Sequence, residues 1–326
     1  MYIPKLSIRQ TQSAIQDLKK IFQEELKKNL NLTRATAPLF VAQETGLNDG
    51  LSGEEPVWFY PRSSKTRLEV VHSLAKWKRY ALQQYHFAPY EGLYTDMNAI
   101  RREEELDELH SYYVDQWDWE KVILEKDRNL DFLKETVNLI YESLKETKIK
   151  LRKLFPTLTD RLPDSVYFIS SQDLENLYPD LSVEARERAI VKEKDAVFVY
   201  KIGYPLKSQI VHSKRAFDYD DWDLNGDLLV YSPVIDKAIE LSSMGIRVNE
   251  KSIVKQSGLS KEEVKKLSPY HAAVVNKKLP LTIGGGIGQS RVSMYLLEKA
   301  HIGEVQASHW PEKYRKQVAK DGIELL

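Results

Sequence analysis

The segment GGGIGQSR, from Gly284 to Arg291, decides how the rest of this chain is interpreted. Four of the chain's 14 glycines fall within five residues here, directly before the helix-like run VSMYLLEKA. Glycine lets the backbone come close to a flat or phosphorylated ligand, and a helix N-terminus adds N–H donors. The segment fits neither the dinucleotide fingerprint, which needs a further glycine, nor the P-loop, which needs Gly-Lys-Ser/Thr.

Two interpretations of these glycines remain open on the spacing alone. They could form a tight strand-to-helix turn that needs positive φ, or they could bring the backbone close to an anion. Arg291 in the first turn of the helix favours the anion, because a cation there opposes the helix dipole and needs a compensating partner.

Upstream, RREEE from Arg101 is followed by a short loop and by HSYYVDQWDWE, residues 110–120. On a strand, Gln116, Asp118 and Glu120 share one face, and two tryptophans point to the other. A solvated antiparallel strand has such a pattern, and so does a strand that presents polar groups to a ligand.

Two charged segments leave similar alternatives. In HSLAKWKR, a helix places Lys76 next to Arg79, with Ser73 and Lys78 on another part of its surface, and such basic faces are usually solvated. In FDYDDWDLNGD, residues 217–227, five aspartates occupy eleven positions. Clustered carboxylates can hold Mg²⁺ or a substrate ammonium, but an Asp/Asn/Gly run is also typical of a turn. The seven histidines show no metal-ligand spacing.

The hydrophobic pattern predicts an α+β fold. Apolar spacing predicts helices at residues 7–32, 72–85 and 130–155, strands near residues 57–60, 68–71, 109–122, 166–170, 196–202 and 228–234, and a polar helical stretch from there to about residue 275. Aromatic, alternating strands between irregular loops favour a large, mainly antiparallel sheet flanked by helices. The turn-rich segment 156–164 is the one weak boundary, so we expect a single domain over residues 1–326.

Composition excludes several classes of function. With no cysteine among 326 residues, the chain has no disulfide, no thiolate metal site and no cysteine nucleophile. Its 48 Lys+Arg balance 48 Asp+Glu, whereas a nucleic-acid-binding protein usually has a basic excess. No apolar run approaches the roughly 18 residues that span a bilayer, and the N-terminus has no signal-like apolar stretch. We therefore expect a cytoplasmic protein with no nucleic-acid or membrane partner.

The order of these segments resembles the three motifs of class II aminoacyl-tRNA synthetases. The first motif corresponds to Ile15–Pro38, the second to Arg101–Glu120 and the third to Gly284–Arg291. Within the aspartate branch, the chain most resembles the ammonia-dependent asparagine synthetases of type A, the aspartate–ammonia ligases. The resemblance covers essentially the whole chain and includes EVVHSLAKWKR, EGLYT, YVDQWDWE, YPDL, RERAI, YDDW, ELSSMGIRV and TIGGGIGQSR.

The resemblance implies a class II synthetase-like catalytic core and a two-step reaction. In this family, ATP with Mg²⁺ adenylates the β-carboxylate of aspartate and releases pyrophosphate, and ammonia then displaces AMP. Carried over residue by residue, the implied catalytic residues are Asp49, Arg101 and Gln116, the aspartate-binding residues are Ser73, Lys78, Asp118, Asp220 and Ser243, and the ATP-binding residues are Asp227, Glu240, Gly286, Gly288 and Arg291. Asp227 and Glu240 are also the implied Mg²⁺ ligands.

The resemblance also implies individual roles. Arg101 would bind the α-phosphate and the substrate carboxylate, and Arg291 would stack on adenine or hold the terminal phosphate. Asp118 would pair with the substrate ammonium and Lys78 with its carboxylate. Asp49 would position the nucleophile and accept a proton from ammonium, since only neutral ammonia can attack. The first-motif helix implies a homodimer.

The chain departs from the family pattern at two places. Gly50 stands where asparagine is common, and the segment between Asp223 and Leu224 is shorter than in some members. A tRNA-charging enzyme is a second hypothesis, but it needs an anticodon-binding domain and a basic surface, for which the motifs leave no room. A non-catalytic relative is a third, and it would be expected to lack Arg101, Arg291 or the acidic pair, all of which are present. Without cysteine there is no glutaminase half, so we expect free ammonia as the nitrogen source.

Overall fold

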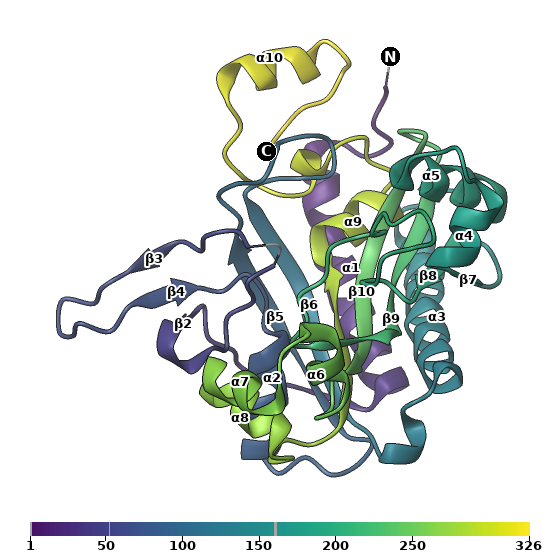
Figure 1. Ribbon diagram of the computed structural model, residues 1–326. Helices are drawn as coiled ribbons and strands as arrows, with labels where there is room; N and C mark the ends of the chain where they lie inside the picture. Colours follow the sequence, from purple (N-terminus) through teal and green to yellow (C-terminus); the bar gives the residue numbers. More distant parts are fainter. Residues whose placement is uncertain (1, 52, 160–161) are drawn as a thin grey trace.

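The computed structural model describes residues 2–51, 53–159 and 162–326, and its centre is an eight-stranded sheet (Figure 1). In spatial order the strands are β1 (Leu32–Arg34), β5 (Gly92–Ile100), β6 (Tyr113–Val122), β11 (Thr282–Gly288), β10 (Lys237–Arg247), β9 (Asp220–Ser232), β8 (Ala196–Tyr200) and β7 (Tyr167–Ser170). The central pairs are antiparallel, and the two outermost pairs are parallel. The predicted large, mainly antiparallel sheet with flanking helices is therefore confirmed.

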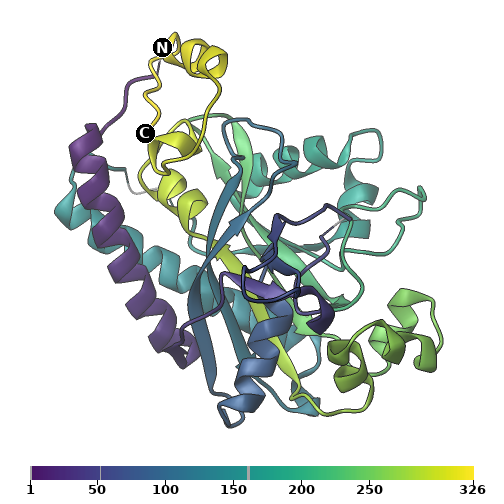
Figure 2. The same cartoon turned by 90° about the vertical axis from the view of Figure 1, so that its left-hand side faces the viewer.

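Two long helices, α1 (Ile8–Leu30) and α3 (Leu130–Leu154), pack side by side on one face of the sheet (Figure 2). The sequence forms α1 because Ser7 and Gln10 make a capping box at its start, and Asn31 adopts the left-handed conformation at its end. The apolar stripe of α1 meets the tryptophan face of β6, where the rings of Phe22 and Trp117 are 4.4 Å apart. This contact is the centre of the main core, and it leaves the polar face of β6 on the other side of the sheet.

Shorter elements cover the rest of the sheet. On the face opposite α1 lies helix α2 (Ala75–Gln84), whose Leu82 packs with Leu93 and Val122. The remaining helices are α4 (Ser171–Leu177), α5 (Val183–Lys194), α6 (Ser252–Ser257), α7 (Lys261–Leu267), α8 (Pro269–Val275), α9 (Gln289–Leu296) and α10 (Glu312–Ala319). Short 3₁₀ turns lie at Gln43–Thr45, Glu125–Asp127 and Ile302–Glu304. A small sheet of β2 (Phe40–Ala42), β4 (Leu68–Val70) and β3 (Trp58–Phe59) projects from the body as an arm (Figure 1). None of the described helices is long and apolar enough to cross a membrane.

The largest error of the sequence prediction lies in the segment after residue 234. It was expected to be helical as far as residue 275, but Lys237–Arg247 is strand β10, and helices begin only at Ser252. The core-facing residues Ile239 and Leu241 are followed by Met244 and Ile246, so the two-residue alternation is interrupted once. A register shift between Glu240 and Ser242 explains this interruption. The β-bulge hides the strand period in the sequence.

Three further differences concern local structure. Strand β5 and helices α4 and α5 were not predicted, and β6 begins at Tyr113 instead of residue 109. The aspartate-rich segment 217–227 is mostly strand, since β9 starts at Asp220, so the turn interpretation is wrong there. The proposed weak boundary at 156–164 includes residues 160–161, which lie outside the described residues.

Candidate active site

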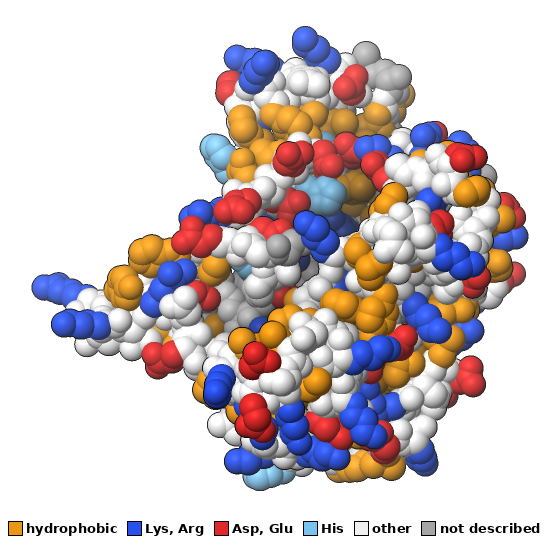
Figure 3. All heavy atoms as spheres, in the orientation of Figure 1, with side chains coloured by type: hydrophobic (Ala, Val, Ile, Leu, Met, Phe, Trp, Pro, Cys, Tyr) orange, Lys and Arg blue, Asp and Glu red, His pale blue; other side chains and the backbone are white. Residues whose placement is uncertain are grey.

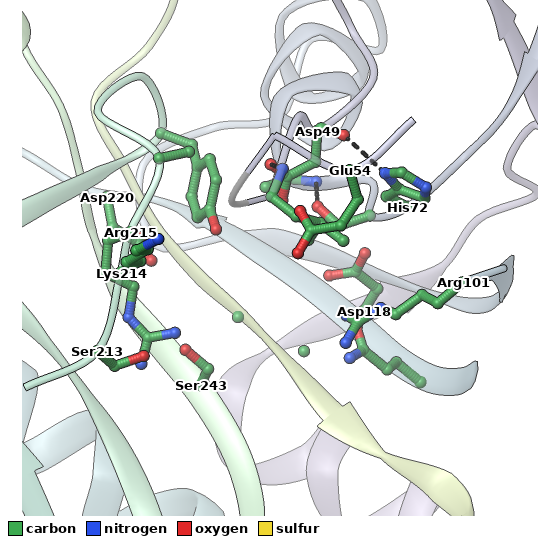
Figure 4. Close-up of a pocket in the computed structure, with 18 of the residues that line it drawn as sticks. Asp49, Glu54, His72, Arg101, Asp118, Ser213, Lys214, Arg215, Asp220 and Ser243 are labelled. Carbon is green, nitrogen blue, oxygen red and sulfur yellow. Dashed lines mark hydrogen bonds between the residues drawn. The ribbon is translucent and has the colours of Figure 1, made fainter. Parts of the chain in front are cut away.

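A cavity of about 370 Å³ opens over the polar face of the central strands (Figure 4). Its base is formed by β6, β11, β10 and β9, and its rim by residues 49–51 and 54–55 and by the loops around residues 101–110 and 213–216. In the space-filling view, acidic side chains gather around the hollow between the projecting arm and the C-terminal helix (Figure 3). The cavity is lined by ten of the thirteen predicted site residues: Asp49, Ser73, Arg101, Gln116, Asp118, Asp220, Glu240, Ser243, Gly286 and Arg291. Lys78 and Asp227 lie behind its wall, and Gly288 lines a smaller neighbouring cavity with Arg291.

The glycine-rich segment is the central strand β11. None of its glycines has positive φ, so the interpretation as a turn that needs positive φ is wrong. A Cβ atom on Gly286 would lie closer than 3.0 Å to the amide of Gln116, and one on Gly284 would lie as close to the carboxylate of Glu120. The glycines are therefore required because side chains of the neighbouring strand occupy the space above them.

Beneath the cavity lies a group of buried charges, Lys78, Asp118, Glu120, Asp220 and Arg247, which we call the buried floor. The ammonium of Lys78 donates to Oδ1 of Asp118 and to the backbone carbonyls of Trp119 and Gly285, at 2.8 and 3.2 Å for the carbonyls. Its side chain is fully buried, so the prediction of a solvated basic helix face is wrong for Lys78. In this position Lys78 orients Asp118 and does not itself face the cavity.

The second half of the buried floor is centred on Arg247. Its Nη2 lies 2.8 Å from Oε2 of Glu120 and its Nε lies 3.0 Å from Oε1, a bidentate pair. Its Nη1 pairs with Asp220, and Thr282 donates to Oε1 of Glu120 at 2.7 Å. Every oxygen of Glu120 therefore has a partner although the side chain is fully buried.

Burial and pairing pull the pKa values of the floor in opposite directions. Complete burial lowers the pKa of Lys78, and the charges of Asp118 and Glu120 oppose this effect. Burial acts to raise the pKa of Glu120, but Arg247 and Lys78 outweigh it, so that this pKa is lowered. Burial raises the pKa of Asp220, against the effect of Arg247. Glu120 is thus held as a carboxylate.

Asp118 connects the floor to helix α2. While Oδ1 pairs with Lys78, Oδ2 accepts a hydrogen bond from the backbone N–H of Leu74 at 3.1 Å, where α2 begins. A carboxylate at this end of a helix is favoured by the free N–H groups and by the helix dipole. Ser73, just before the helix, lines the cavity beside it. The position of Asp118 in the cavity wall is thus fixed by secondary structure.

The opposite part of the cavity, which we call the open end, carries looser charges: Arg101, Asp227, Glu240 and Arg291. Nη1 of Arg291 lies 3.8 Å from Oε1 of Glu240, and Nη1 of Arg101 lies 3.9 Å from Oε2 of Glu104. The Nε of Arg101 is buried without a hydrogen-bond partner in the described chain. Arg291 also donates a hydrogen bond to the backbone carbonyl of Glu240 at 3.2 Å, but neither guanidinium group has a close carboxylate partner among the described residues, and both residues line the cavity.

Asp227 is the buried member of the open end. Its Oδ2 pairs with Arg215, whereas its Oδ1 is buried without a hydrogen-bond partner among the described residues. Burial raises the pKa of Asp227 to about 6, because the attraction of Arg215 is offset in part by the nearby charge of Glu240. Of the pair of carboxylates on β9 and β10, Asp227 is thus paired with Arg215 through one oxygen only, and Glu240 has Arg291 at 3.8 Å.

Asp49 lies in the loop above the cavity and is almost fully buried. Its Oδ1 accepts a hydrogen bond from the backbone N–H of Leu51 at 2.8 Å, and the ring of His72 contacts its backbone carbonyl at 3.1 Å. His72 is itself buried, as expected of a packing residue. Figure 4 shows Asp49, Glu54 and His72 together on the same wall, facing the region above Asp118.

Sequence reasoning missed several cavity residues, above all Arg247, Lys214 and Arg215. Arg247 ends the segment ELSSMGIR, and only the bulge of β10 turns its side chain to the polar face. Lys214 and Arg215 precede the aspartate-rich segment, and five clustered carboxylates were a signal that cations must lie nearby.

Comparison with known proteins gives a consistent result. A protein-family model described as aspartate-ammonia ligase matches residues 9–322. The chain is 53% identical to an aspartate–ammonia ligase of Clostridium tetani, over all of this chain and 96% of the relative, and 52% identical to one of Ureaplasma parvum, over 99% of both.

Among solved structures, the fold is similar to that of asparaginyl-tRNA synthetases. The structure from Pyrococcus horikoshii, complexed with asparaginyl-adenylate, has a TM-score of 0.66 at 17% identity and covers 92% of this chain and 70% of that one. The corresponding complex from Entamoeba histolytica has a TM-score of 0.65 at 17% identity, over 94% and 68%. The predicted class II synthetase-like fold is confirmed.

Proposed function

The chain belongs to the aspartate–ammonia ligase family, and on that premise we propose that its cavity makes L-asparagine from L-aspartate, ammonia and ATP. AMP and pyrophosphate are the other products, and a β-aspartyl-adenylate is the intermediate. The observation that carries the proposal is the division of one cavity into a buried floor that suits an amino acid and an open end whose two guanidinium groups, without a close carboxylate partner in the described chain, suit phosphates. A class II tRNA-charging reaction would use the same fold, but the net charge of zero does not favour tRNA.

Aspartate is proposed to bind on the buried floor. The substrate ammonium would meet the carboxylates of Asp118 and Asp220, and its α-carboxylate would meet Arg247 where that residue lines the cavity, with Ser73 and Ser243 beside it. Lys78 is better assigned as a positioning residue for Asp118 than as a direct ligand of the substrate carboxylate, because all its contacts lie beneath the cavity.

Adenylation is proposed to occur between the floor and the open end. A β-carboxylate oxygen of aspartate attacks the α-phosphorus of ATP, and the bond to the bridging oxygen of pyrophosphate breaks. Arg101 would bridge the α-phosphate and the attacking carboxylate, while the amide of Gln116 would orient that carboxylate. Arg291 would contact the nucleotide from the start of α9, with the backbone of Gly286 and Gly288 beside it.

The second step needs neutral ammonia at the adenylate. We propose that Asp49 accepts a proton from ammonium, after which nitrogen attacks the carbonyl carbon and AMP leaves with the electrons of the C–O bond. Asp49→Asn should preserve aspartate-dependent exchange of pyrophosphate into ATP and slow the release of asparagine. An equal loss of both rates would contradict this role.

Magnesium is proposed to bind at the open end through Asp227 and Glu240. The fit rests on the buried Oδ1 of Asp227, which lacks a partner, and on hard carboxylate oxygens, which Mg²⁺ prefers. The described chain contains no cluster of three His, Cys, Asp or Glu residues that could hold a metal. The two carboxylates of Asp227 and Glu240 nevertheless suit Mg²⁺, which commonly takes one or two carboxylates together with substrate phosphates. When bound, it would neutralise part of the phosphate charge.

Three broader statements are also proposals. We propose that residues 1–326 form one catalytic domain, that the enzyme is a homodimer joined through the first-motif helix α1, and that it works in the cytoplasm without a nucleic-acid or membrane partner. Helix α1 lies on the face of the sheet away from the cavity, so a partner there would leave the cavity open (Figure 2). Analytical ultracentrifugation tests the dimer, and a monomer at micromolar concentration would contradict it.

One assay tests the function. The purified chain is incubated with aspartate and MgATP, with either ammonium or glutamine, and asparagine and AMP are measured. We expect both products with ammonium and neither with glutamine, because the chain has no cysteine for a glutaminase step. Absence of asparagine with ammonium would refute the proposed function.

A further inference from the structure

The segment between β8 and β9, residues 203–217, crosses the open end of the cavity, and we call it the strap. Its outer half is fixed to the body of the protein. Pro205 and Val211 form an isolated bridge, and the backbone N–H of Lys207 donates to Oε1 of Gln172 on α4 at 2.8 Å. Ser208 donates its hydroxyl to Oε1 of Glu175 at 2.6 Å. The strap is therefore an ordered part of the structure.

The inner half of the strap is tied down next to the cavity. The ring of His212 is buried, and its Nε2 lies 2.9 Å from Oε1 of Glu187 on α5. The next three residues, Ser213, Lys214 and Arg215, line the cavity. In Figure 4 they lie near Ser243, across from the wall that carries Asp118 and Arg101. The contact of His212 with Glu187 thus fixes the backbone of the strap two residues before Lys214.

The charges of the cavity distinguish Lys214 from its neighbours. Arg215 pairs with Asp227, Arg247 pairs with Glu120 and Asp220, and Arg102 lies 2.7 Å from Glu55. In the described parts of the chain, the ammonium of Lys214 forms no ion pair, and its side chain is exposed at the edge of the cavity. An unpaired lysine that borders a cavity and sits beside Arg215 is suited to an anionic ligand.

We propose that Lys214 binds the β- and γ-phosphates of ATP and the pyrophosphate that leaves, which deepens the proposed function and rests on it. The charges of aspartate are already matched by Asp118, Asp220 and Arg247 on the buried floor. ATP brings the larger negative charge, and its outer phosphates lie toward the open end if Arg101 holds the α-phosphate. Arg215 links the strap directly to Asp227, next to which the phosphates and the metal would meet.

The mechanism of Lys214 is electrostatic. When the α-phosphorus bond breaks, negative charge builds up on the pyrophosphate oxygens. An ammonium group fixed beside them stabilises that charge without a further covalent step. Lys214 is then a substrate-binding residue for the nucleotide, with no contact to adenine or to the α-phosphate.

Nucleotide binding, measured by titration calorimetry without aspartate, tests the inference. Lys214→Met should weaken binding of MgATP by roughly tenfold or more, because a charge-assisted hydrogen bond to phosphate is lost. Binding of AMP, which has no β- or γ-phosphate, should change by less than about twofold. Lys214→Arg should restore most of the affinity for MgATP. Lys207→Met, on the outer half of the same strap, is the matched control and should bind both nucleotides as the wild type does.

Two results would overturn the inference: wild-type affinity of Lys214→Met for MgATP, or an equal loss of affinity for MgATP and AMP. The calorimetry also separates this inference from the proposed function. If the wild type binds MgATP but forms no asparagine with aspartate and ammonium, the proposed function fails, while the difference between MgATP and AMP still tests Lys214.

Discussion

The buried floor and the open end hold similar numbers of charged groups but differ in how closely these groups are paired and how far they are buried. On the floor, Arg247 meets Glu120 at 2.8 Å, and both side chains are almost completely buried. At the open end, Arg101 and Arg291 lie 3.9 and 3.8 Å from their nearest carboxylates and are 28% and 23% exposed. A buried charge without a partner costs several kcal/mol, so the floor must be complete before any ligand arrives. A partly exposed guanidinium tolerates a weak partner, and can exchange it for phosphate.

The comparison implies that stability and catalysis are carried by different regions of one cavity. The floor is preorganised for a small zwitterion, and removing one of its charges should unfold the protein before it changes specificity. The open end is completed by the nucleotide, and removing one of its charges should leave a folded protein that is inactive. Four variants test this division.

Arg247→Met should have the largest effect. It leaves the carboxylates of Glu120 and Asp220 buried without their partner, so we expect a loss of about 3–5 kcal/mol in the free energy of unfolding. Urea denaturation at pH 7 measures this loss of unfolding free energy. The matched control is Arg102→Met, which breaks a half-exposed pair with Glu55 and should cost about 0–1 kcal/mol. Equal midpoints for the two variants would refute the distinction.

Arg101→Ala should act on the reaction and not on the fold. Loss of one preorganised contact to the transition state raises the barrier by about 3–4 kcal/mol, so AMP formation should fall by roughly two to three orders of magnitude. Its nearest carboxylate is 3.9 Å away, so the free energy of unfolding should change by less than about 1 kcal/mol. Single-turnover formation of AMP and urea denaturation are the two measurements. Arg188→Ala, an exposed arginine on α5, should change neither.

The pH dependence of stability should have opposite signs in the two regions. Burial raises the pKa of Asp227 to about 6, so the native protein keeps this proton where the unfolded chain loses it. Its favourable contribution is complete below the ordinary pKa of 3.8 and is lost as the pH rises through 6. The unfolding free energy of the wild type minus that of Asp227→Asn should therefore fall by about 2–3 kcal/mol from pH 4 to pH 7.

Urea midpoints of both proteins between pH 4 and pH 8, in buffer with EDTA, measure this difference. Arg247 lowers the pKa of Glu120, so the contribution of Glu120 has the other sign and is lost as the pH falls through the native pKa. A difference for Asp227 that is flat or rises with pH would show that its burial is not what shifts its pKa.

The same two regions explain what the sequence could predict. The alternation of β6 correctly placed Gln116, Asp118 and Glu120 on one face, because a central strand keeps its period of two. The resemblance to the ligase family supplied thirteen site residues, and ten of them line the cavity. The resemblance also implied that Lys78 pairs with the substrate carboxylate. The burial of Lys78 beneath the cavity depends on α2 packing over the sheet, a tertiary feature that no local pattern encodes.

Arg247 and Lys214 were missed for two different physical reasons. The period of two that starts at Ile239 and Leu241 would place Arg247 on the core face, and only the bulge in β10 turns it to the polar face. Lys214 lies in a loop whose path is set by distant contacts with α4 and α5, two helices that the sequence did not predict. Loops at the rim of a site are positioned by the scaffold, so local sequence carries little information about them.

We expect the smallest effects from alanine substitutions of two glycines, Gly286 in the strand at the base of the cavity and Gly50 in the loop above it. In Gly286→Ala, the new methyl group would lie closer than 3.0 Å to the amide of Gln116, on a strand that cannot move away. We expect a loss of about 1–3 kcal/mol in stability, with slower adenylation because Gln116 is displaced. In Gly50→Ala, the methyl group would meet no atom of the described residues within 4 Å, at a position without positive φ. That variant should lie within about 0.5 kcal/mol of the wild type, or be slightly more stable because the unfolded chain loses entropy.

Urea denaturation and pyrophosphate exchange measure both variants. A Gly286→Ala protein as stable and as active as Gly50→Ala would mean that Gln116 can rearrange freely, and that the base of the cavity is less rigid than the contacts of β6 and β11 imply.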